Sequence, residues 1–214
     1  MRGIFITIEG PDGSGKSTQI RLLEEYLKDK GYNVVVTREP GGTRISEDIR
    51  KVILDTSNTN MSPHTEALLY AASRAQHVYE TILPALRKGK IVICDRFVDS
   101  SLVYQGFARG LGIEKIKEIN DFATEGLEPD ITLFFDIDVD VALKRIGNRT
   151  TRDRLDKENV EFHRKVYEGY MKIREMYSHR IEVINAACDI ENTFKQVKNV
   201  IDRLLELNEK EVLR

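Results

Sequence analysis

Glycines and a lysine with a characteristic spacing stand near the start of the chain, where residues 10–17 read GPDGSGKS. This stretch matches G-x-x-x-x-G-K-[ST], the P-loop that wraps around nucleotide phosphates. The glycines allow backbone conformations that turn successive N–H groups toward phosphate oxygens. Lys16 adds a positive charge for the β- and γ-phosphates, and Ser17 adds a hydroxyl that can bind Mg²⁺. The motif predicts a site for a nucleoside triphosphate.

A second candidate site for an anion lies in residues 37–43, TREPGGT. The apolar residues 34–36 before it predict a strand, and ligands of open α/β sheets bind beyond the carboxyl ends of strands. Arg38 is therefore placed to meet an anion near the P-loop, although an arginine exposed in an ordinary turn would give the same pattern. The Glu39–Pro40 bond can adopt the cis form, which is a minority state even before proline.

A carboxylate and a guanidinium, Asp95 and Arg96, follow the apolar residues 91–94. An aspartate at the end of a buried strand resembles a Walker B carboxylate, which reaches Mg²⁺ directly or through water. Many P-loop ATPases carry a glutamate at the next position to activate water, whereas this chain carries an arginine. The pair favours an enzyme that handles a second anion over a hydrolytic motor.

Side chains suited to a nucleobase share helical faces in two segments. Tyr70 and Arg74 are four residues apart in a helical pattern, so a ring and a guanidinium can stack on a base and donate to its carbonyl edge. A core tyrosine beside a surface arginine is the alternative interpretation. Ser101, Tyr104 and Gln105 are spaced by three and four and offer hydroxyl and amide groups to a base or a sugar.

Basic residues gather in residues 144–154, KRIGNRTTRDR, where apolar residues are almost absent. This composition is typical of an exposed, mobile loop, and a solvated charged surface is the simplest interpretation. In a P-loop fold the same segment suits a lid at about residues 145–157. Phosphoryl transfer needs water excluded and developing charge neutralised, and arginines in a closing lid meet both needs.

Alternating strand and helix patterns must position these side chains. Short apolar runs predict five strands, at residues 4–8, 34–36, 90–94, 131–135 and 181–184. Helical periodicity fills the stretches between them, including one helix over residues 65–86 and a last helix over residues 190–204. Continuous apolar strands fit parallel strands covered on both faces, so the fold class expected is α/β with βαβ crossovers. No linker divides the 214 residues, which suits a single domain over residues 1–214.

The composition argues against several classes of protein. Lys plus Arg is 33 and Asp plus Glu is 35, a balance that argues against a dedicated nucleic-acid-binding protein. No secretion signal or membrane-spanning apolar stretch is evident. Cys94 and Cys188 have no metal-binding spacing and are expected to be buried free thiols. These features predict a cytoplasmic protein with neither a membrane nor a nucleic acid as partner.

Taken in order, the motifs resemble those of bacterial thymidylate kinases over nearly the full length of the chain. The resemblance rests on residues 8–19 (IEGPDGSGKSTQ), 37–43 (TREPGGT), 68–74 (LLYAASR), 95–97 (DRF), 104–106 (YQG) and 153–156 (DRLD). The P-loop alone would indicate only nucleotide binding, whereas the ordered set is specific.

This resemblance implies an activity and an architecture. The activity is phosphoryl transfer from MgATP to dTMP, giving ADP and dTDP in the pathway to dTTP. The architecture is an adenylate-kinase-like P-loop NTPase, a three-layer α/β/α fold around five parallel strands, and a homodimer. One branch of the family carries a catalytic arginine within the P-loop, where this chain has Ser14. The chain therefore resembles the branch that supplies arginines from the lid.

The resemblance also implies roles for individual residues. ATP would be bound by Gly10, Asp12, Gly13, Ser14, Gly15, Lys16, Ser17, Thr18 and Arg145, and Mg²⁺ by Ser17 and Asp95. The dTMP site would contain Asp12, Arg38, Tyr70, Arg74, Arg96, Ser101, Tyr104 and Gln105, with Arg38 on the phosphate, Tyr70 stacked on thymine and Tyr104 crowding a ribose 2′-hydroxyl. Catalysis would use Asp12, Lys16, Arg96, Arg149 and Arg154, while Arg145 and Arg152 remain alternatives and one of the lid arginines can pack on adenine instead.

Two other functions fit parts of the pattern. Another nucleoside monophosphate kinase could accept AMP, CMP or UMP on the same scaffold, since Tyr70, Arg74 and Tyr104 favour a deoxypyrimidine mainly by resemblance. A nucleotide-dependent switch or binding module would give the lid arginines no role. The guanine-binding signature Asn-Lys-x-Asp is absent from the sequence, which weakens a GTPase switch.

Overall fold

The sheet of this protein consists of parallel strands, as the sequence predicts. A computed structural model describes residues 3–147 and 153–212. Its five strands are β1 (Phe5–Glu9), β2 (Val34–Arg38), β3 (Ile91–Asp95), β4 (Ile131–Asp136) and β5 (Ile181–Asn185). All four pairings between them are parallel, so the predicted five-stranded parallel sheet is confirmed. Each strand ends beyond its apolar run on a polar residue, and these polar ends lie at one edge of the sheet.

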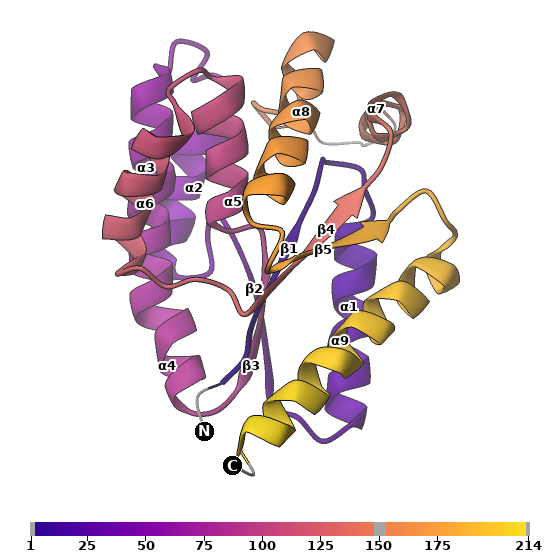
Figure 1. Cartoon of the computed structure of the whole chain (residues 1–214). Helices are drawn as coiled ribbons and strands as arrows, with labels where there is room; N and C mark the ends of the chain where they lie inside the picture. Colours follow the sequence, from indigo (N-terminus) through magenta and orange to yellow (C-terminus); the bar gives the residue numbers. More distant parts are fainter. Residues whose placement is uncertain (1–2, 148–152, 213–214) are drawn as a thin grey trace.

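The strand order β2-β3-β1-β4-β5 brings the candidate residues Arg38 and Asp95 close to the P-loop. Arg38 is paired in register with Asp95, which is paired in turn with Ile8 on β1. The P-loop therefore follows a strand whose neighbour ends in Asp95, and Arg38 lies one strand farther out (Figure 1). Ligands of such sheets bind beyond this edge.

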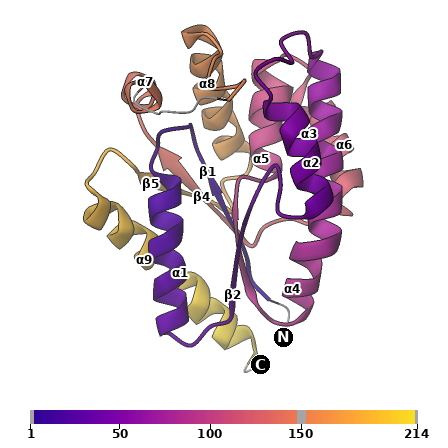
Figure 2. The ribbon, with the colours of Figure 1, turned by 180° about the vertical axis from the view of Figure 1, so that it is seen from behind.

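Helices cover both faces of the sheet (Figures 1 and 2). On one face lie α1 (Lys16–Asp29) and α9 (Ile190–Val212). On the other lie α2 (Arg44–Leu54), α3 (Pro63–His77), α4 (Leu83–Arg87), α5 (Val98–Ser101), α6 (Ile113–Thr124) and α8 (Val160–Met176). The short α7 (Val139–Gly147) follows β4 near the P-loop. Among the described residues, no helix is both long enough and apolar enough to cross a membrane.

Two apolar layers hold this arrangement together. Leu23 and Leu27 of α1 and Ile201 of α9 are fully buried against one face of the sheet. On the opposite face, Phe134 of β4 stacks on Tyr170 of α8, with ring centroids 5.1 Å apart. At about 25 cal/mol per Å² of apolar surface, such layers stabilise the sheet and fix its carboxyl edge as a rigid base for the site.

The predicted helix over residues 65–86 is longer than expected and interrupted. It starts at Pro63, because the Ser62 hydroxyl accepts a hydrogen bond from the Thr65 N–H at 3.1 Å, and its last segment ends at Arg87. A π-helical segment, η1 (Val78–Ile82), separates α3 from α4. A second π-helical segment, η2 (Leu102–Ala108), continues α5. Hydrophobic periodicity does not distinguish π from α turns over such short stretches, and π segments recur at functional sites.

The two cysteines differ in exposure. Cys94, on β3, is a buried free thiol as predicted, and burial raises its pKa. Cys188 is free but exposed, so the prediction of a buried thiol is wrong at this position. It lies in the turn between β5 and α9, where the sequence has no strand or helix periodicity to indicate burial.

Candidate active site

The P-loop connects β1 to α1 with the backbone that its glycines allow. Gly10 has φ 138°, and a Cβ atom there would lie 2.7 Å from the Phe135 carbonyl oxygen, so the loop cannot accept a larger residue without moving. Gly15 is left-handed at φ 89° and precedes Lys16, the first residue of α1. The N–H groups of the first helical turn thus face the loop, as phosphate binding requires.

Lys16 is folded back onto its own loop. Its Nζ donates to the carbonyl oxygens of Gly10 and Pro11 at 3.0 and 2.9 Å, and the residue is 6% exposed. Burial, reinforced by the nearby Arg96 charge, lowers its pKa to about 8. A phosphate that reaches Lys16 would displace these two carbonyls and raise the pKa of Lys16 again, because a nearby negative charge favours the charged amine.

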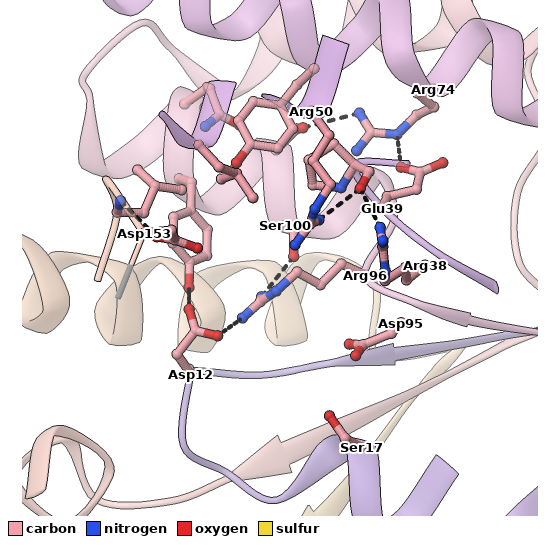
Figure 3. Close-up of a pocket in the computed structure, with 17 residues that line it drawn as sticks. Asp12, Ser17, Arg38, Glu39, Arg50, Arg74, Asp95, Arg96, Ser100 and Asp153 are labelled. Carbon is pink, nitrogen blue, oxygen red and sulfur yellow. Dashed lines mark hydrogen bonds and ion pairs between the residues drawn. The ribbon is translucent and has the colours of Figure 1, made fainter. Parts of the chain in front are cut away.

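A cavity of about 290 Å³ lies beside the P-loop, over the carboxyl ends of β2 and β3 (Figure 3). Its walls come from the P-loop, the ends of β2 and β3, α2, α3, the α5–η2 segment, Asp153 and Leu155. All eight predicted acceptor residues line it: Asp12, Arg38, Tyr70, Arg74, Arg96, Ser101, Tyr104 and Gln105. The structure therefore brings the whole predicted acceptor set to one cavity.

Two guanidinium groups converge at one corner of this cavity. Arg38 and Arg50 both donate to the Pro40 carbonyl oxygen, at 3.0 and 2.7 Å. The Glu39–Pro40 peptide bond just before this carbonyl is cis. Arg38 also pairs with Glu47 at 3.1 Å, while burial and the Arg38 charge lower the pKa of Arg50. The corner has two cations and one partly exposed carboxylate, a composition that suits an anion.

Arg74 is held from four directions in the wall of the cavity. Its Nε donates to Glu39 at 2.6 Å, Nη1 donates to Ser101 at 3.0 Å and to Asn120, and Nη2 donates to the Phe97 carbonyl at 3.0 Å. The residue is 1% exposed, so its charge is paired and desolvated at once. It is not the surface arginine of the alternative interpretation.

Arg96 and Asp12 face each other across the cavity floor (Figure 3). Arg96 Nη2 lies 3.1 Å from Asp12 Oδ1, and the Tyr104 hydroxyl donates to Asp12 Oδ2 at 3.4 Å. The Arg96 guanidinium also lies 5.4 Å from the centroid of the Tyr104 ring. Asp12, although part of the P-loop motif, thus faces the acceptor residues as well as the donor loop.

The remaining acceptor residues differ in how firmly they are held. Ser101 accepts from Arg74, and Gln105 donates to Glu66 at 2.9 Å. Tyr70 is half-buried in the cavity wall, and burial together with the Glu66 charge raises its pKa. The Tyr70 hydroxyl is therefore neutral at physiological pH.

Ser17 and Asp95 form the candidate metal site. Both line a second cavity of about 220 Å³, which Lys16, Arg96 and Arg145 also line. Ser17, Asp95 and Arg96 are labelled in Figure 3. Asp95 Oδ1 is buried and has no hydrogen-bond partner among the described residues. A hydroxyl and an unpartnered carboxylate oxygen beside a phosphate loop are donors that Mg²⁺ accepts.

A groove of about 680 Å³ continues from the P-loop between α1 and the start of α9. Ser14 and Thr18 line one side of it, and Ile190 lines the other. Arg145, on α7, borders the groove and donates to the Gly13 carbonyl at 3.1 Å. Five residues of the predicted ATP site line this groove, namely Gly13, Ser14, Gly15, Thr18 and Arg145, whereas Asp12, Lys16 and Ser17 line the second cavity instead.

Of the predicted lid arginines that the structure describes, Arg145 lies at the P-loop and Arg154 lies away from it. Arg154 Nη2 donates to Glu66 at 2.6 Å and its Nε donates to the Ile53 carbonyl at 2.9 Å, so its side chain is held by α2 and α3. It does not line the acceptor cavity, although its neighbours Asp153 and Leu155 do. Arg149 and Arg152 lie outside the described residues. The catalytic role of Arg154 stays a prediction, and it requires the pair with Glu66 to open.

Several residues of the site have no signal in the sequence. Arg50 lies on an amphipathic helix that looks solvated, and Glu39 lies in a loop whose partner on α3 is 35 residues away. Asn120 reaches Arg74 from α6. Only Glu39, as a carboxylate within the quoted loop motif, offered a hint. The others depend on contacts between distant segments that composition and spacing do not contain.

Comparisons with known proteins agree with this geometry. The family model for thymidylate kinase matches residues 8–197. A thymidylate kinase of Finegoldia magna is 56% identical over 200 residues, covering 94% of this chain and 98% of the relative, and one of Geobacillus sp. (strain WCH70) is 53% identical over 207 residues, covering 95% and 99%. The crystal structure of thymidylate kinase from Ehrlichia chaffeensis superposes with a TM-score of 0.77 at 36% identity, covering 94% of this chain and 99% of that one. The chain belongs to the thymidylate kinase family.

Proposed function

We propose that this chain transfers the γ-phosphoryl group of ATP to dTMP, giving ADP and dTDP for dTTP synthesis. Family membership supports the activity. The main structural support is the acceptor cavity beside the P-loop. It is lined by two neighbouring arginines, Arg38 and Arg50, by the half-buried Tyr70 and by the firmly held Arg74. These are the groups that a phosphate, a planar base and a carbonyl edge require.

On the donor side, the P-loop amides and Lys16 hold the phosphates of ATP, and the groove bordered by Thr18 and Arg145 receives the nucleoside. Ser17 and Asp95 are the residues that would hold Mg²⁺, which would supply positive charge to neutralise the phosphates. The unpartnered Asp95 oxygen supports this assignment.

On the acceptor side, Arg38 and Arg50 bind the dTMP phosphate, because both guanidinium groups meet at the cavity corner. Tyr70 stacks on thymine and Arg74 donates to its edge, with one N–H of Nη2 in addition to the bond to Phe97. Ser101, Tyr104 and Gln105 complete the base and sugar site.

Catalysis consists mainly of positioning and charge neutralisation. Arg96 contacts the transferring phosphoryl group, and Asp12 orients Arg96 and the acceptor. Residues 145–157 act as a lid of this single kinase domain and bring Arg149 and Arg154 to the transition state. The pair between Arg154 and Glu66 is the contact that this movement breaks.

The activity is tested with a coupled assay of ADP release across dTMP, dUMP, AMP, CMP and GMP. We expect the highest kcat/KM with dTMP. A higher value with AMP, CMP or GMP would instead indicate another nucleoside monophosphate kinase. Nucleotide binding without ADP release would indicate a switch or binding module.

The protein also functions as a homodimer in this proposal. Exposed apolar side chains lie on three neighbouring helices of one face, Leu68 on α3 (57% exposed), Phe122 on α6 (90%) and Val52 on α2 (47%). A monomer seldom leaves such side chains grouped on one face. Sedimentation should therefore give a dimer that Leu68→Glu dissociates. Leu207→Glu, on α9 of the opposite layer, is the matched control that should leave the dimer intact.

A further inference from the structure

A buried carboxylate lies directly beneath the P-loop and has no role in the mechanism so far. Glu9 is the last residue of β1 and is 1% exposed. Its Oε1 accepts from the backbone N–H groups of Phe97 and Ser100 at 2.7 and 3.2 Å. Its Oε2 accepts from the hydroxyls of Ser100 and Tyr170 at 2.5 and 3.0 Å. Four donors on one side chain make Glu9 the centre of a network.

The same two hydroxyls accept from Arg96. Arg96 Nη1 donates to Ser100 Oγ at 3.1 Å and to the Tyr170 hydroxyl at 3.0 Å. A hydroxyl has one proton and two lone pairs. Because each hydroxyl directs its proton toward Glu9, its lone pairs are left to face Arg96.

Arg96 needs this support because its backbone is unusual. Its φ is 69°, in the left-handed region that residues other than glycine rarely adopt. Glu9 holds the next backbone amide, that of Phe97, and so fixes the turn from the inside. The side chain and the backbone of Arg96 are thus both constrained by one carboxylate.

We propose that Glu9 is a positioning residue for phosphoryl transfer, which orients Arg96 toward the transferring group through the hydroxyls of Ser100 and Tyr170. The inference rests on the proposed function. Glu9 does not line any of the cavities beside the P-loop, and its four contacts are all protein donors. Its contribution is to keep two acceptors pointed at a catalytic cation.

The charges around Glu9 determine the conditions for a test. Burial and the Asp99 charge raise its pKa to about 7, against the lowering effect of Arg96. Other titratable groups that interact with it are Lys16, Cys94, Tyr104 and Tyr170. Measurements at pH 8.5 therefore compare variants with an ionised carboxylate in the parent protein.

The first variant is Glu9→Gln, measured at pH 8.5 with both substrates saturating. The amide keeps the shape but donates where Oε2 accepts, so the hydroxyl protons turn toward Arg96 and repel it. Since small displacements of catalytic groups can cost about 10²-fold, we expect kcat to fall by roughly 10–100-fold while KM for ATP stays within about threefold. A kcat equal to that of the parent protein would overturn the proposal.

Tyrosine variants on one helix give a matched pair. Tyr170→Phe removes one of the two acceptors, and we expect kcat to fall by about three- to tenfold. Tyr167→Phe, one turn away on α8, removes a hydroxyl that bonds Asp136 instead, and it should leave kcat unchanged. Equal effects of the two substitutions would contradict a specific role for the network.

A double-mutant cycle separates positioning from a merely structural role. If Glu9 acts through Arg96, Glu9→Gln should lower the residual kcat of Arg96→Met by less than about twofold. An undiminished loss in that background would overturn the proposal. Failure of the parent protein to phosphorylate dTMP would instead overturn the proposed function, so the two failures are distinguishable. Thermal unfolding of each variant confirms that a folded protein is compared.

Discussion

The acceptor side and the donor side of this active site hold their cations in different ways. On the acceptor side, Arg74 is almost fully buried. It donates to the side chains of Glu39, Ser101 and Asn120 and to the backbone carbonyl of Phe97. On the donor side, Lys16 bonds the carbonyls of its own loop and Arg145 has an exposed side chain. Arg154 is bound to α3 by Glu66.

The difference concerns which groups must exchange partners before reaction. Arg74 presents its remaining N–H to the cavity without moving, so recognition of a base would cost little ordering of the protein. Lys16 and Arg154 must leave protein oxygens for phosphate oxygens. A site with a prepared acceptor pocket, whose donor-side cations must first leave protein oxygens, favours catalytic alignment only when both nucleotides are present.

The largest effect is expected for Lys16→Ala, which tests whether the donor side and the acceptor side act independently. We expect kcat to fall by at least about 10³-fold, because the substitution removes the cation of the P-loop motif, which we propose holds the donor phosphates. KM for dTMP should change by less than about threefold if the two sides are independent. Steady-state ADP release measures both constants. Lys28→Ala, an exposed lysine on the same helix paired with Glu24, is the control and should leave kcat unchanged. Substantial residual turnover of Lys16→Ala would refute the P-loop assignment.

Arg154→Ala tests whether Arg154, whose side chain is bound to Glu66 on α3, stabilises the phosphoryl group during transfer. We expect kcat to fall by about 10²–10³-fold with little change in dTMP affinity, because the guanidinium is needed only when charge develops on the phosphoryl group. Pre-steady-state turnover and dTMP titration measure the two effects.

Arg109→Ala is the matched control, since Arg109 pairs with the same Glu66 at 3.2 Å. Both substitutions remove one cation from this carboxylate, so both should lower stability. Only Arg154→Ala should lower kcat by more than tenfold. Equal kinetic effects would mean that Arg154 acts by holding Glu66.

Arg74→Met tests the acceptor side, where Arg74 is already held in place. Removing one partner leaves Glu39 buried without its cation, and such losses cost about 3–5 kcal/mol of folding free energy. We also expect KM for dTMP to rise by about 10–100-fold, while KM for ATP stays within about threefold. Urea unfolding and initial rates measure these changes. Arg180→Met, which breaks a similarly buried pair with Asp99, should lower stability without raising KM for dTMP.

The sequence predicted one side of this comparison better than the other. Strand runs and the P-loop were sufficient to predict the parallel sheet. The acceptor set came from helical spacing together with the resemblance to thymidylate kinases. Helical spacing correctly put Tyr70 and Arg74 on one helix. The partners that fix Arg74, such as Asn120 on α6, and the pairing of Arg154 with Glu66 arise from packing between helices that have no local signal. Periodicity also missed both π-helical segments, one of which, η2, contains the acceptor residues Tyr104 and Gln105.

The smallest expected effect is that of Tyr70→Phe, which sharpens what the acceptor side recognises. Tyr70 stands in the cavity wall, and its contribution to stacking depends on the ring rather than on the hydroxyl. We therefore expect KM for dTMP to change by less than about threefold in Tyr70→Phe, but to rise by about tenfold or more in Tyr70→Ala, where the stacking surface is lost. Initial rates at varied dTMP measure both variants, and Tyr26→Phe, whose hydroxyl bonds Asp202 far from the site, is the control. A tenfold rise in Tyr70→Phe would show that the hydroxyl itself reads the nucleotide. The acceptor pocket would then recognise its substrate by a polar contact at Tyr70 as well as by the fixed guanidinium of Arg74.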